Sequence, residues 1–356
     1  MARHFRKTST VSAGGLLIGG DHPARLQTMW KEPVKRGSFE DLVRRIEILV
    51  SYGAELIRFA VPDVDTANLL CELQDAVSIP VVADIHFDHT LALVCLKKLP
   101  KIRINPGNIG SPDKVREVVK MASDKGAALR VGVNAGSLPR SLRGEKDIAR
   151  AMLAAAEDEM DLLEAVGFSN VLFSLKSSDI RTTVRANELF AERHAYPLHL
   201  GVTEAGPPIQ GVVKNTAALV PLLRHGIGDT IRVSLSGSCE DELIAGREIL
   251  AASGRVIRRV NIISCPRCGR AGFDVHAFLA KVEPWLMSLE ASIDVALMGC
   301  VVNGPEEARH ADVGITGSGR KVLIFSRGEI VRRVLPEDAE IAFREEVQKL
   351  CGKANE

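Results

Sequence analysis

The sequence predicts an α/β protein built as a (β/α)8 barrel of the TIM type, followed by a small α/β iron–sulfur domain. Three observations support this prediction. Short apolar, β-branched runs alternate eight times with amphipathic segments, polar residues gather where these runs end, and three cysteines in a metal-binding pattern follow. Strands buried on both faces of a parallel sheet are continuous apolar runs of this kind. An open doubly wound sheet is the alternative that the alternation allows.

The eight apolar runs are the expected barrel strands. They cover residues 24–29, 56–61, 81–85, 102–105, 129–134, 171–176, 198–203 and 231–235. Helical patterns with apolar residues at every third or fourth position lie between them, as at 39–50, 112–122 and 146–166. Each strand is therefore followed by a helix, which is the repeat of a barrel.

A second domain is expected after the eighth strand–helix unit, so the predicted domains are 1–248 and 249–356. The elements expected in it are a strand at 256–263, a helix at 274–289, a strand at 293–298, a strand pair around 319–325 and a helix at 336–350. The metal-binding cysteines fall in the loops of this domain.

Composition excludes several classes of protein. The 356 residues carry a net charge of +1 and 4% aromatic residues, which argues against nucleic acid as a partner. No stretch approaches the roughly 20 apolar residues of a membrane span. Seven cysteines without a secretory leader indicate reduced thiols in the cytoplasm.

Basic residues stand on five different expected strands. They are Arg58, Arg103, Arg130, Lys176 and Arg232. Buried arginines are costly without a counter-charge, and barrel enzymes bind ligands at the carboxyl ends of their strands. The excess of positive charge therefore predicts a polyanionic small molecule, a phosphate or diphosphate, because guanidinium groups match phosphate oxygens in pairs.

Other polar residues also lie at strand ends. They are Asp84, His86, Asn105, Asn134, Glu204 and Ser234. Asp84 and His86 are either an internal pair that orders a loop or part of the catalytic site. Glu204 stands in a turn after the seventh strand, where a carboxyl group can deliver or remove a proton.

Three cysteines form the metal pattern. Cys265 and Cys268 are separated by two residues, and Cys300 follows after a further strand. A close pair and a distant third thiol are one ligand short of a four-cysteine site, and Glu306 or Glu307 can fold back to supply the fourth. Structural zinc normally requires a second close pair, so an iron–sulfur cluster is favoured over zinc.

These motifs together resemble the 4-hydroxy-3-methylbut-2-enyl diphosphate synthase family. The similarity spans nearly the whole chain and is carried by the segments 83–88, 103–110, 201–206, 228–234, 264–270 and 298–305. The resemblance implies reductive ring opening of 2-C-methyl-D-erythritol 2,4-cyclodiphosphate in the non-mevalonate isoprenoid pathway. It further implies two electrons from flavodoxin or ferredoxin, loss of water, and a homodimer.

The resemblance also implies roles for individual residues. A [4Fe-4S] cluster would be held by Cys265, Cys268, Cys300 and Glu307. The diphosphate would be bound by Arg58, Arg103, Arg130, Asn134, Lys176, Arg232 and Ser234, and Glu204 would donate a proton.

The sequence departs from the family at three loops. Glu306 replaces a glycine, Arg267 stands where threonine is common, and Trp30-Lys31 replaces Thr-Asn after the first strand. Two other classes compete with this assignment. A barrel phosphatase or aldolase with structural zinc predicts a colourless protein, and a non-enzymatic iron–sulfur sensor predicts no tight diphosphate site.

Overall fold

The computed structural model describes residues 6–353 except 106–108, 110, 256–259, 301–309 and 319. Contacts between residues divide the chain into two compact units, Met1–Val256 and Ile257–Glu356. Helix α9 (Cys239–Ala252) lies wholly in the first unit, so the expected boundary at residue 248 falls inside a helix. In the described part of the chain, no helix combines the length and apolar character needed to cross a membrane.

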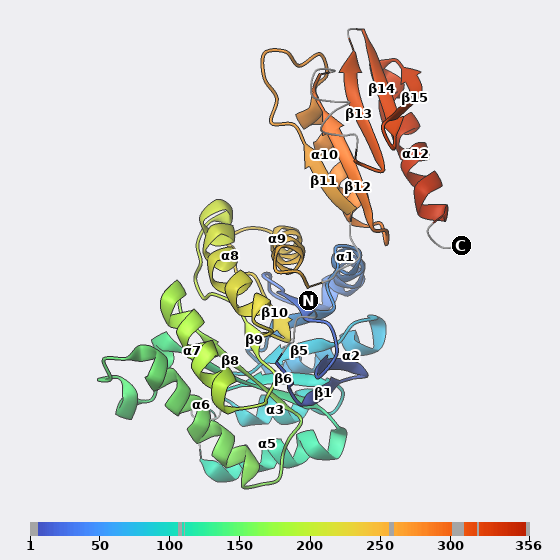
Figure 1. Cartoon of the computed structure of the whole chain (residues 1–356). Coiled ribbons are helices and arrows are strands. Elements are labelled where there is room, and N and C mark those ends of the chain that lie inside the picture. The colour runs from blue at the N-terminus through green and yellow to red at the C-terminus, as the bar shows by residue number, and fades with distance from the viewer. Residues whose placement is uncertain are drawn as a thin grey trace. The chain divides into compact units, whose positions relative to one another are not determined.

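The first unit is a parallel eight-stranded barrel surrounded by helices (Figure 1). Its strands are β3 (Arg25–Met29), β4 (Leu56–Ala60), β5 (Val81–Asp84), β6 (Lys101–Ile104), β7 (Ala128–Asn134), β8 (Val171–Lys176), β9 (His199–Leu200) and β10 (Thr230–Ile231). They run in the order β8-β7-β6-β5-β4-β3-β10-β9, and a parallel bridge from Phe173 to Leu198 closes the ring. The predicted (β/α)8 barrel is confirmed, and the open doubly wound alternative is wrong.

Helices follow the strands as the sequence pattern predicts. Besides α9 they are α1 (Phe39–Ser51), α2 (Val64–Ala76), α3 (His89–Cys95), α5 (Pro112–Lys125), α6 (Ile148–Glu164), α7 (Ile180–Arg193) and α8 (Pro208–Arg224). Local signals fix their ends: the Asp179 side chain accepts a hydrogen bond from the Thr182 amide at the start of α7, and Gly126 ends α5 in a left-handed conformation.

Strands β9 and β10 are shorter than predicted, because a helix takes the hydrogen bonds that a longer ladder would use. The Asn215 side chain, on α8, accepts from the Val202 amide at 3.3 Å and donates to the Ser234 carbonyl at 3.4 Å. The backbone beyond both strands is therefore tied to α8 and is free to form loops at the carboxyl end of the barrel.

The amino-terminal hairpin, β1 (Thr10–Ala13) and β2 (Leu16–Gly19), was not predicted. Its buried residues Val11 and Ile18 pack against Leu56, Val82 and other residues at the beginning of the barrel strands. The hairpin closes the amino end of the barrel, so a ligand can enter at the opposite end.

The described part of the second unit is a five-stranded mixed sheet packed with helices (Figure 1). Its strands are β11 (Val260–Ser264), β12 (Ile293–Met298), β13 (Val313–Ser318), β14 (Lys321–Ser326) and β15 (Glu329–Val334), and its helices are α10 (Val275–Met287) and α12 (Ala339–Lys353). The helices share an apolar core with alternate strand residues such as Val295 and Leu297. Ala296 and Met298 belong to a separate cluster that includes Cys265.

Candidate active site

The carboxyl end of the barrel collects the bases that the sequence singled out. Arg103 and Arg130 are buried on neighbouring strands β6 and β7, where they pair in register. Lys176 ends β8 and is buried as well. Arg58 and Arg232 are partly buried on or beside β4 and β10. Five basic side chains from five strands therefore share one end of the barrel.

Asp84 is the counter-charge for one side of this group. Arg103 Nη1 donates to Asp84 Oδ1 at 3.1 Å, and Arg58 Nε lies 3.7 Å from Asp84 Oδ2. His86 Nε2 lies 3.6 Å from the same carboxylate. Burial alone would raise the pKa of Asp84, but the contact with His86 and the two arginine charges outweigh it and hold that pKa well below its usual range.

These contacts determine which side chains are charged at neutral pH at the mouth of the barrel, which is its carboxyl end. Burial lowers the pKa of Arg58 to about 10, with Asp84 opposing the shift, so Arg58 stays protonated. Asp84 thus contacts His86 and two arginines at the same time. Asn105, directly after β6, and Asn134, at the end of β7, are both half-buried at the same end of the barrel.

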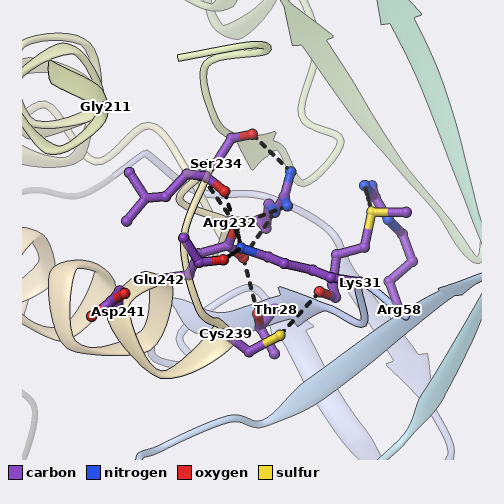
Figure 2. Close-up of polar contacts among 12 residues, drawn as sticks. Thr28, Lys31, Arg58, Gly211, Arg232, Ser234, Cys239, Asp241 and Glu242 are labelled. Atoms are coloured by element: carbon purple, nitrogen blue, oxygen red, sulfur yellow. Dashed lines mark hydrogen bonds and ion pairs between the residues drawn. The ribbon is translucent and has the colours of Figure 1, made fainter. Parts of the chain in front are cut away.

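Glu242 is the counter-charge for the other side, and sequence reasoning missed it (Figure 2). Arg232 donates to its carboxylate through Nη2 at 2.9 Å and Nε at 3.3 Å, and Lys31 Nζ lies 3.0 Å away. Glu242 stands in the acidic first turn of α9, beside Glu240 and Asp241, where such residues are typical of helix starts. No local pattern distinguishes the one carboxylate that turns into the barrel.

Arg130 is held differently, because its contact among the described residues is a hydroxyl group. Arg130 Nη1 donates to Ser174 Oγ at 2.8 Å, while Nε and Nη2 have no hydrogen-bond partner in the part of the chain that the structure describes. Unpaired buried donors cost about 1–3 kcal/mol each, and more when charged. Such donors indicate a site that a ligand or water completes.

Lys101 is a further base that the sequence analysis overlooked. It is fully buried at the start of β6, two residues before Arg103, so both side chains lie on the same face of the strand. Its Nζ has no hydrogen-bond partner among the described residues. Burial, and then the charge of Arg130, lowers the pKa of Lys101 well below its normal value. The alternation of side chains along β6, which places residues 101 and 103 on one face, is the sequence signal that indicates Lys101.

Two glycines make room for these long side chains. A Cβ atom at Gly132 would lie 2.7 Å from Arg103 Nε, and one at Gly201 would lie 2.8 Å from Lys176 Nζ. Burial and the charge of Arg130 lower the pKa of Lys176. Among the described residues, the six basic side chains thus have two carboxylate partners, Asp84 and Glu242.

Glu204 lies in the loop between β9 and α8, with its side chain exposed. Its φ angle of 51° places it in the left-handed region, which residues other than glycine rarely adopt. Such strain is found at functional sites, where the surrounding structure holds a side chain in place. Ser234, the last predicted residue, is half-buried and accepts from Arg232 Nη1 at 3.0 Å.

The cysteines lie at one edge of the sheet in the second unit. Strands β11 and β12 are parallel, with Ser264 opposite Leu297, and the Cys265 amide donates to the Leu297 carbonyl at 2.9 Å. Gly272, after the Cys265–Cys268 turn, donates to the carbonyl of Gly299 at 2.9 Å. The turn that carries two thiols is therefore bonded to the residue before Cys300.

The turn between the first two thiols has an unusual residue. Arg267 adopts a φ of 68°, and its Nη1 lies 3.2 Å from Asp274 Oδ1, which also accepts from the Ala277 amide at the start of α10. Cys268 is exposed and Cys265 is half-buried. The left-handed residue lets the chain reverse between the two thiols.

The fourth ligand of the cluster is expected from one of two neighbouring glutamates. Glu306 and Glu307 lie in 301–309, outside the described residues. Among the residues that are described, no three His, Cys, Asp or Glu side chains form a group that could hold a metal. The residue types are nevertheless suitable for an iron–sulfur cluster, because the turn with two cysteines and Cys300 follow the parallel strands β11 and β12, and a carboxylate stands shortly after Cys300 in the sequence.

The barrel and its cationic mouth define a class: enzymes that bind a polyanionic substrate at the carboxyl end of a (β/α)8 barrel. Comparison with known families assigns the chain more closely. Residues 8–247 match the model described as the GcpE TIM-barrel domain, and residues 261–349 match the GcpE protein C-terminal domain. The chain belongs to the GcpE family.

Curated relatives agree over nearly the whole chain. The protein named 4-hydroxy-3-methylbut-2-en-1-yl diphosphate synthase (flavodoxin) from Treponema denticola is 46% identical and covers 96% of this chain and 98% of its own length. The protein of that name from Treponema pallidum is 47% identical, with coverages of 98% and 93%. The predicted resemblance and the predicted oxidoreductase of isoprenoid biosynthesis are confirmed, and the phosphatase or aldolase alternative is not supported.

The comparison with solved structures includes matches to a part of this chain. A Yersinia pestis DHPS with a pterine-sulfa conjugate superposes with a TM-score of 0.52 at 13% identity, covering 69% of this chain and all of that one. At that identity the likeness supports the fold and says nothing about the reaction.

Proposed function

We propose that this chain converts 2-C-methyl-D-erythritol 2,4-cyclodiphosphate to 4-hydroxy-3-methylbut-2-enyl diphosphate by reductive ring opening. The observation that carries the proposal is the uncompensated charge inside the barrel, where Arg130 and Lys101 have buried nitrogen atoms without partners in the described structure. Curated relatives that bear the name of this synthase support the choice of substrate.

The diphosphate would lie between two groups of basic residues, one of which contacts Asp84 and the other Glu242. Arg58 and Arg103 on one side, and Arg232 on the other, are fixed by Asp84 and Glu242, so their free N–H groups are oriented before the ligand arrives. Lys101, Arg130 and Lys176, which are buried, would supply further positive charge from inside the barrel. The polar residues that complete the proposed substrate site are His86, Asn105, Asn134 and Ser234.

The reaction must break two carbon–oxygen bonds, one to the diphosphate and one to a hydroxyl group. Both bonds leave their electron pairs on oxygen, and two electrons supplied from outside become the new carbon–carbon double bond. Fixed cations stabilise the diphosphate oxygen that is released. We assign Glu204 as the acid that protonates the departing hydroxyl group, which leaves as water.

The proposed cofactor is a [4Fe-4S] cluster held by Cys265, Cys268, Cys300 and Glu307. When bound, such a cluster supplies electrons at low potential and offers an iron with a replaceable oxygen ligand. The thiols at the β11 and β12 edge would hold it, and Arg267 and Asp274 would fix the turn that carries two of them.

The proposed partners follow from the electron requirement. Flavodoxin, which the names of the relatives include, would deliver the electrons, and ferredoxin is the alternative donor. We further propose a homodimer, in which the thiol-bearing unit of one subunit serves the barrel of the other. A reducing cytoplasm suits a site built from thiols.

The test is anaerobic turnover of the cyclodiphosphate by the reconstituted full chain with a low-potential reductant, followed by phosphorus NMR. We expect reductant-dependent formation of the linear diphosphate and a broad visible absorption that Cys300→Ser removes. Arg130→Met should lower kcat/KM by about a hundredfold or more, because fixed charges at a leaving group contribute at least that much.

The matched control is Arg150→Met, which removes an exposed arginine from helix α6 and should leave turnover unchanged. Release of inorganic phosphate without reductant by a colourless, zinc-containing protein would instead support a phosphatase and refute the proposal.

A further inference from the structure

Glu242 is unusually well satisfied for a carboxylate outside the predicted site. Its side chain is 1% exposed and accepts hydrogen bonds from Arg232, from the Thr28 hydroxyl at 3.0 Å and from the Leu235 amide at 3.1 Å. Strand β3, the loop after β10 and helix α9 are joined at this one group (Figure 2). A buried carboxylate held by this many donors has a fixed orientation.

The contact with Arg232 leaves a defined part of the guanidinium group available. Nε and Nη2 donate to Glu242, and Nη1 donates to Ser234. A guanidinium group has five N–H bonds, so one remains on each terminal nitrogen. Arg232 also lines a cavity of about 680 Å³ together with Trp30, Phe59 and Leu235. The remaining donors therefore belong to a side chain at the wall of an open space.

Lys31 changes the charge of this arrangement. Its Nζ lies 3.0 Å from Glu242 Oε1 and donates to the carbonyl groups of Leu235 and Gly237, which follow β10. Arg232 and Glu242 alone would sum to zero charge, whereas the three residues sum to +1.

We propose that Glu242 and Lys31 are positioning residues for Arg232: Glu242 fixes the orientation of the guanidinium group, and Lys31 offsets the carboxylate so that the full charge of Arg232 acts on the bound anion. This inference rests on the proposed function, because it takes Arg232 to be a diphosphate contact. It adds two residues that the family resemblance did not single out.

Two variants distinguish the effect of charge from the effect of orientation, because they change the net charge of the three residues in opposite directions. Lys31→Met lowers the charge of the three residues to zero, whereas Glu242→Gln raises it to +2. If charge alone mattered, Glu242→Gln would tighten anion binding. If Glu242 orients Arg232, that variant weakens binding despite its added charge, since an amide nitrogen next to a guanidinium group cannot accept its hydrogen bonds.

The experiment measures the affinity of the full reconstituted chain for inorganic pyrophosphate by calorimetry, and KM and kcat for the cyclodiphosphate. We expect Lys31→Met to raise Kd and KM about tenfold with kcat changed less than about twofold, as for a lost charge near an anion. Lys31→Arg should restore the affinity. Glu242→Gln should raise Kd about tenfold or more, although its charge is more positive.

The matched control is Lys120→Met, which removes the same charge from helix α5 on the outside of the barrel and should bind as the wild type does. Melting temperatures identify a variant that fails to fold. If Glu242→Gln does not fold, the loss with Lys31→Met and the recovery with Lys31→Arg still decide the charge part of the proposal.

Two negative results have different meanings. If the wild-type chain binds no pyrophosphate and turns over no cyclodiphosphate, the proposed function fails and this inference fails with it. If the wild type binds and turns over but Lys31→Met and Glu242→Gln equal it, the proposed function stands and the positioning roles are refuted. Tighter binding by Glu242→Gln would refute the orienting role of Glu242.

Discussion

Replacing Lys101 with methionine should make the protein more stable while weakening its binding of anions. The side chain is fully buried, its Nζ has no hydrogen-bond partner among the described residues, and burial together with Arg130 lowers its pKa. Methionine has a similar length and no charge. In the absence of ligand, the wild-type chain therefore carries an unfavourable group that the variant lacks.

The size of the gain follows from comparable replacements. Exchanging buried ionic groups for apolar residues of similar volume is neutral or stabilising by about 1–4 kcal/mol, and Lys101 pairs with no carboxylate among the residues that the structure describes. We expect a gain of about 2 kcal/mol. For a unit of this size each kcal/mol raises the melting temperature by roughly 2–4 °C, so the barrel should melt about 4–8 °C higher.

The effect should also depend on pH with a definite sign. Because the pKa of Lys101 is lowered in the folded state, the unfolded chain binds this proton more strongly, and wild-type stability rises with pH. The advantage of Lys101→Met should therefore be greatest at low pH and shrink as the pH approaches about 10, the pKa of a free lysine.

The assay is thermal and urea denaturation of the full chain over a pH series, with pyrophosphate affinity measured in parallel. Lys120→Met, which removes an exposed lysine from α5, is the control for the loss of a charge. A destabilised Lys101→Met variant, or one that binds pyrophosphate as tightly as the wild type does, would show that the amine already has an internal partner and would refute this reasoning.

Two further predictions concern the residues that arrange the bases. Asp84→Asn should cost about 3–5 kcal/mol of stability near pH 7, because it leaves Arg58 and Arg103 without their carboxylate. The lowered pKa of Asp84 places its contribution above about pH 4, so denaturation near pH 3 should show a smaller difference; an unchanged difference would contradict this. Gly201→Ala should cost about 1–3 kcal/mol and weaken pyrophosphate binding, since its Cβ would lie 2.6 Å from the Arg232 carbonyl oxygen and 2.8 Å from Lys176 Nζ. Gly144→Ala, with nothing within 4 Å of its Cβ, is the control, and equal behaviour of the two variants would contradict this prediction.

The barrel could be predicted because its information is local. Most strands are apolar runs of ordinary length, with β9 and β10 as short exceptions, and each helix has its own period and ends, such as Gly126 after α5. The amino-terminal hairpin escaped because its two strands have four residues each, and their burial depends on the floor of a barrel formed by later segments. A short strand without its partner surface has no distinctive pattern.

The basic residues of the site could also be predicted, but the groups that hold them could not. A strand arginine is conspicuous in sequence because it is costly to bury. Glu242 is inconspicuous, since acidic residues are common in the first turn of a helix, and its contacts with Lys31 and Thr28 join residues more than 200 positions apart. Lys101 was missed because it begins β6 instead of ending it.

The two carboxylates explain why the remaining bases can stay unsatisfied. Asp84 and Glu242 neutralise charge at two parts of the mouth, on β5 and α9, and they hold Arg103 and Arg232 by hydrogen bonds. If every base had such a partner, the mouth would be neutral and would attract no anion. If none had, mutual repulsion would destabilise the barrel by more than its marginal stability allows. In the described part of the chain Arg130 and Lys101 have no carboxylate partner, which limits the cost to a few kcal/mol and leaves uncompensated charge that a diphosphate can offset.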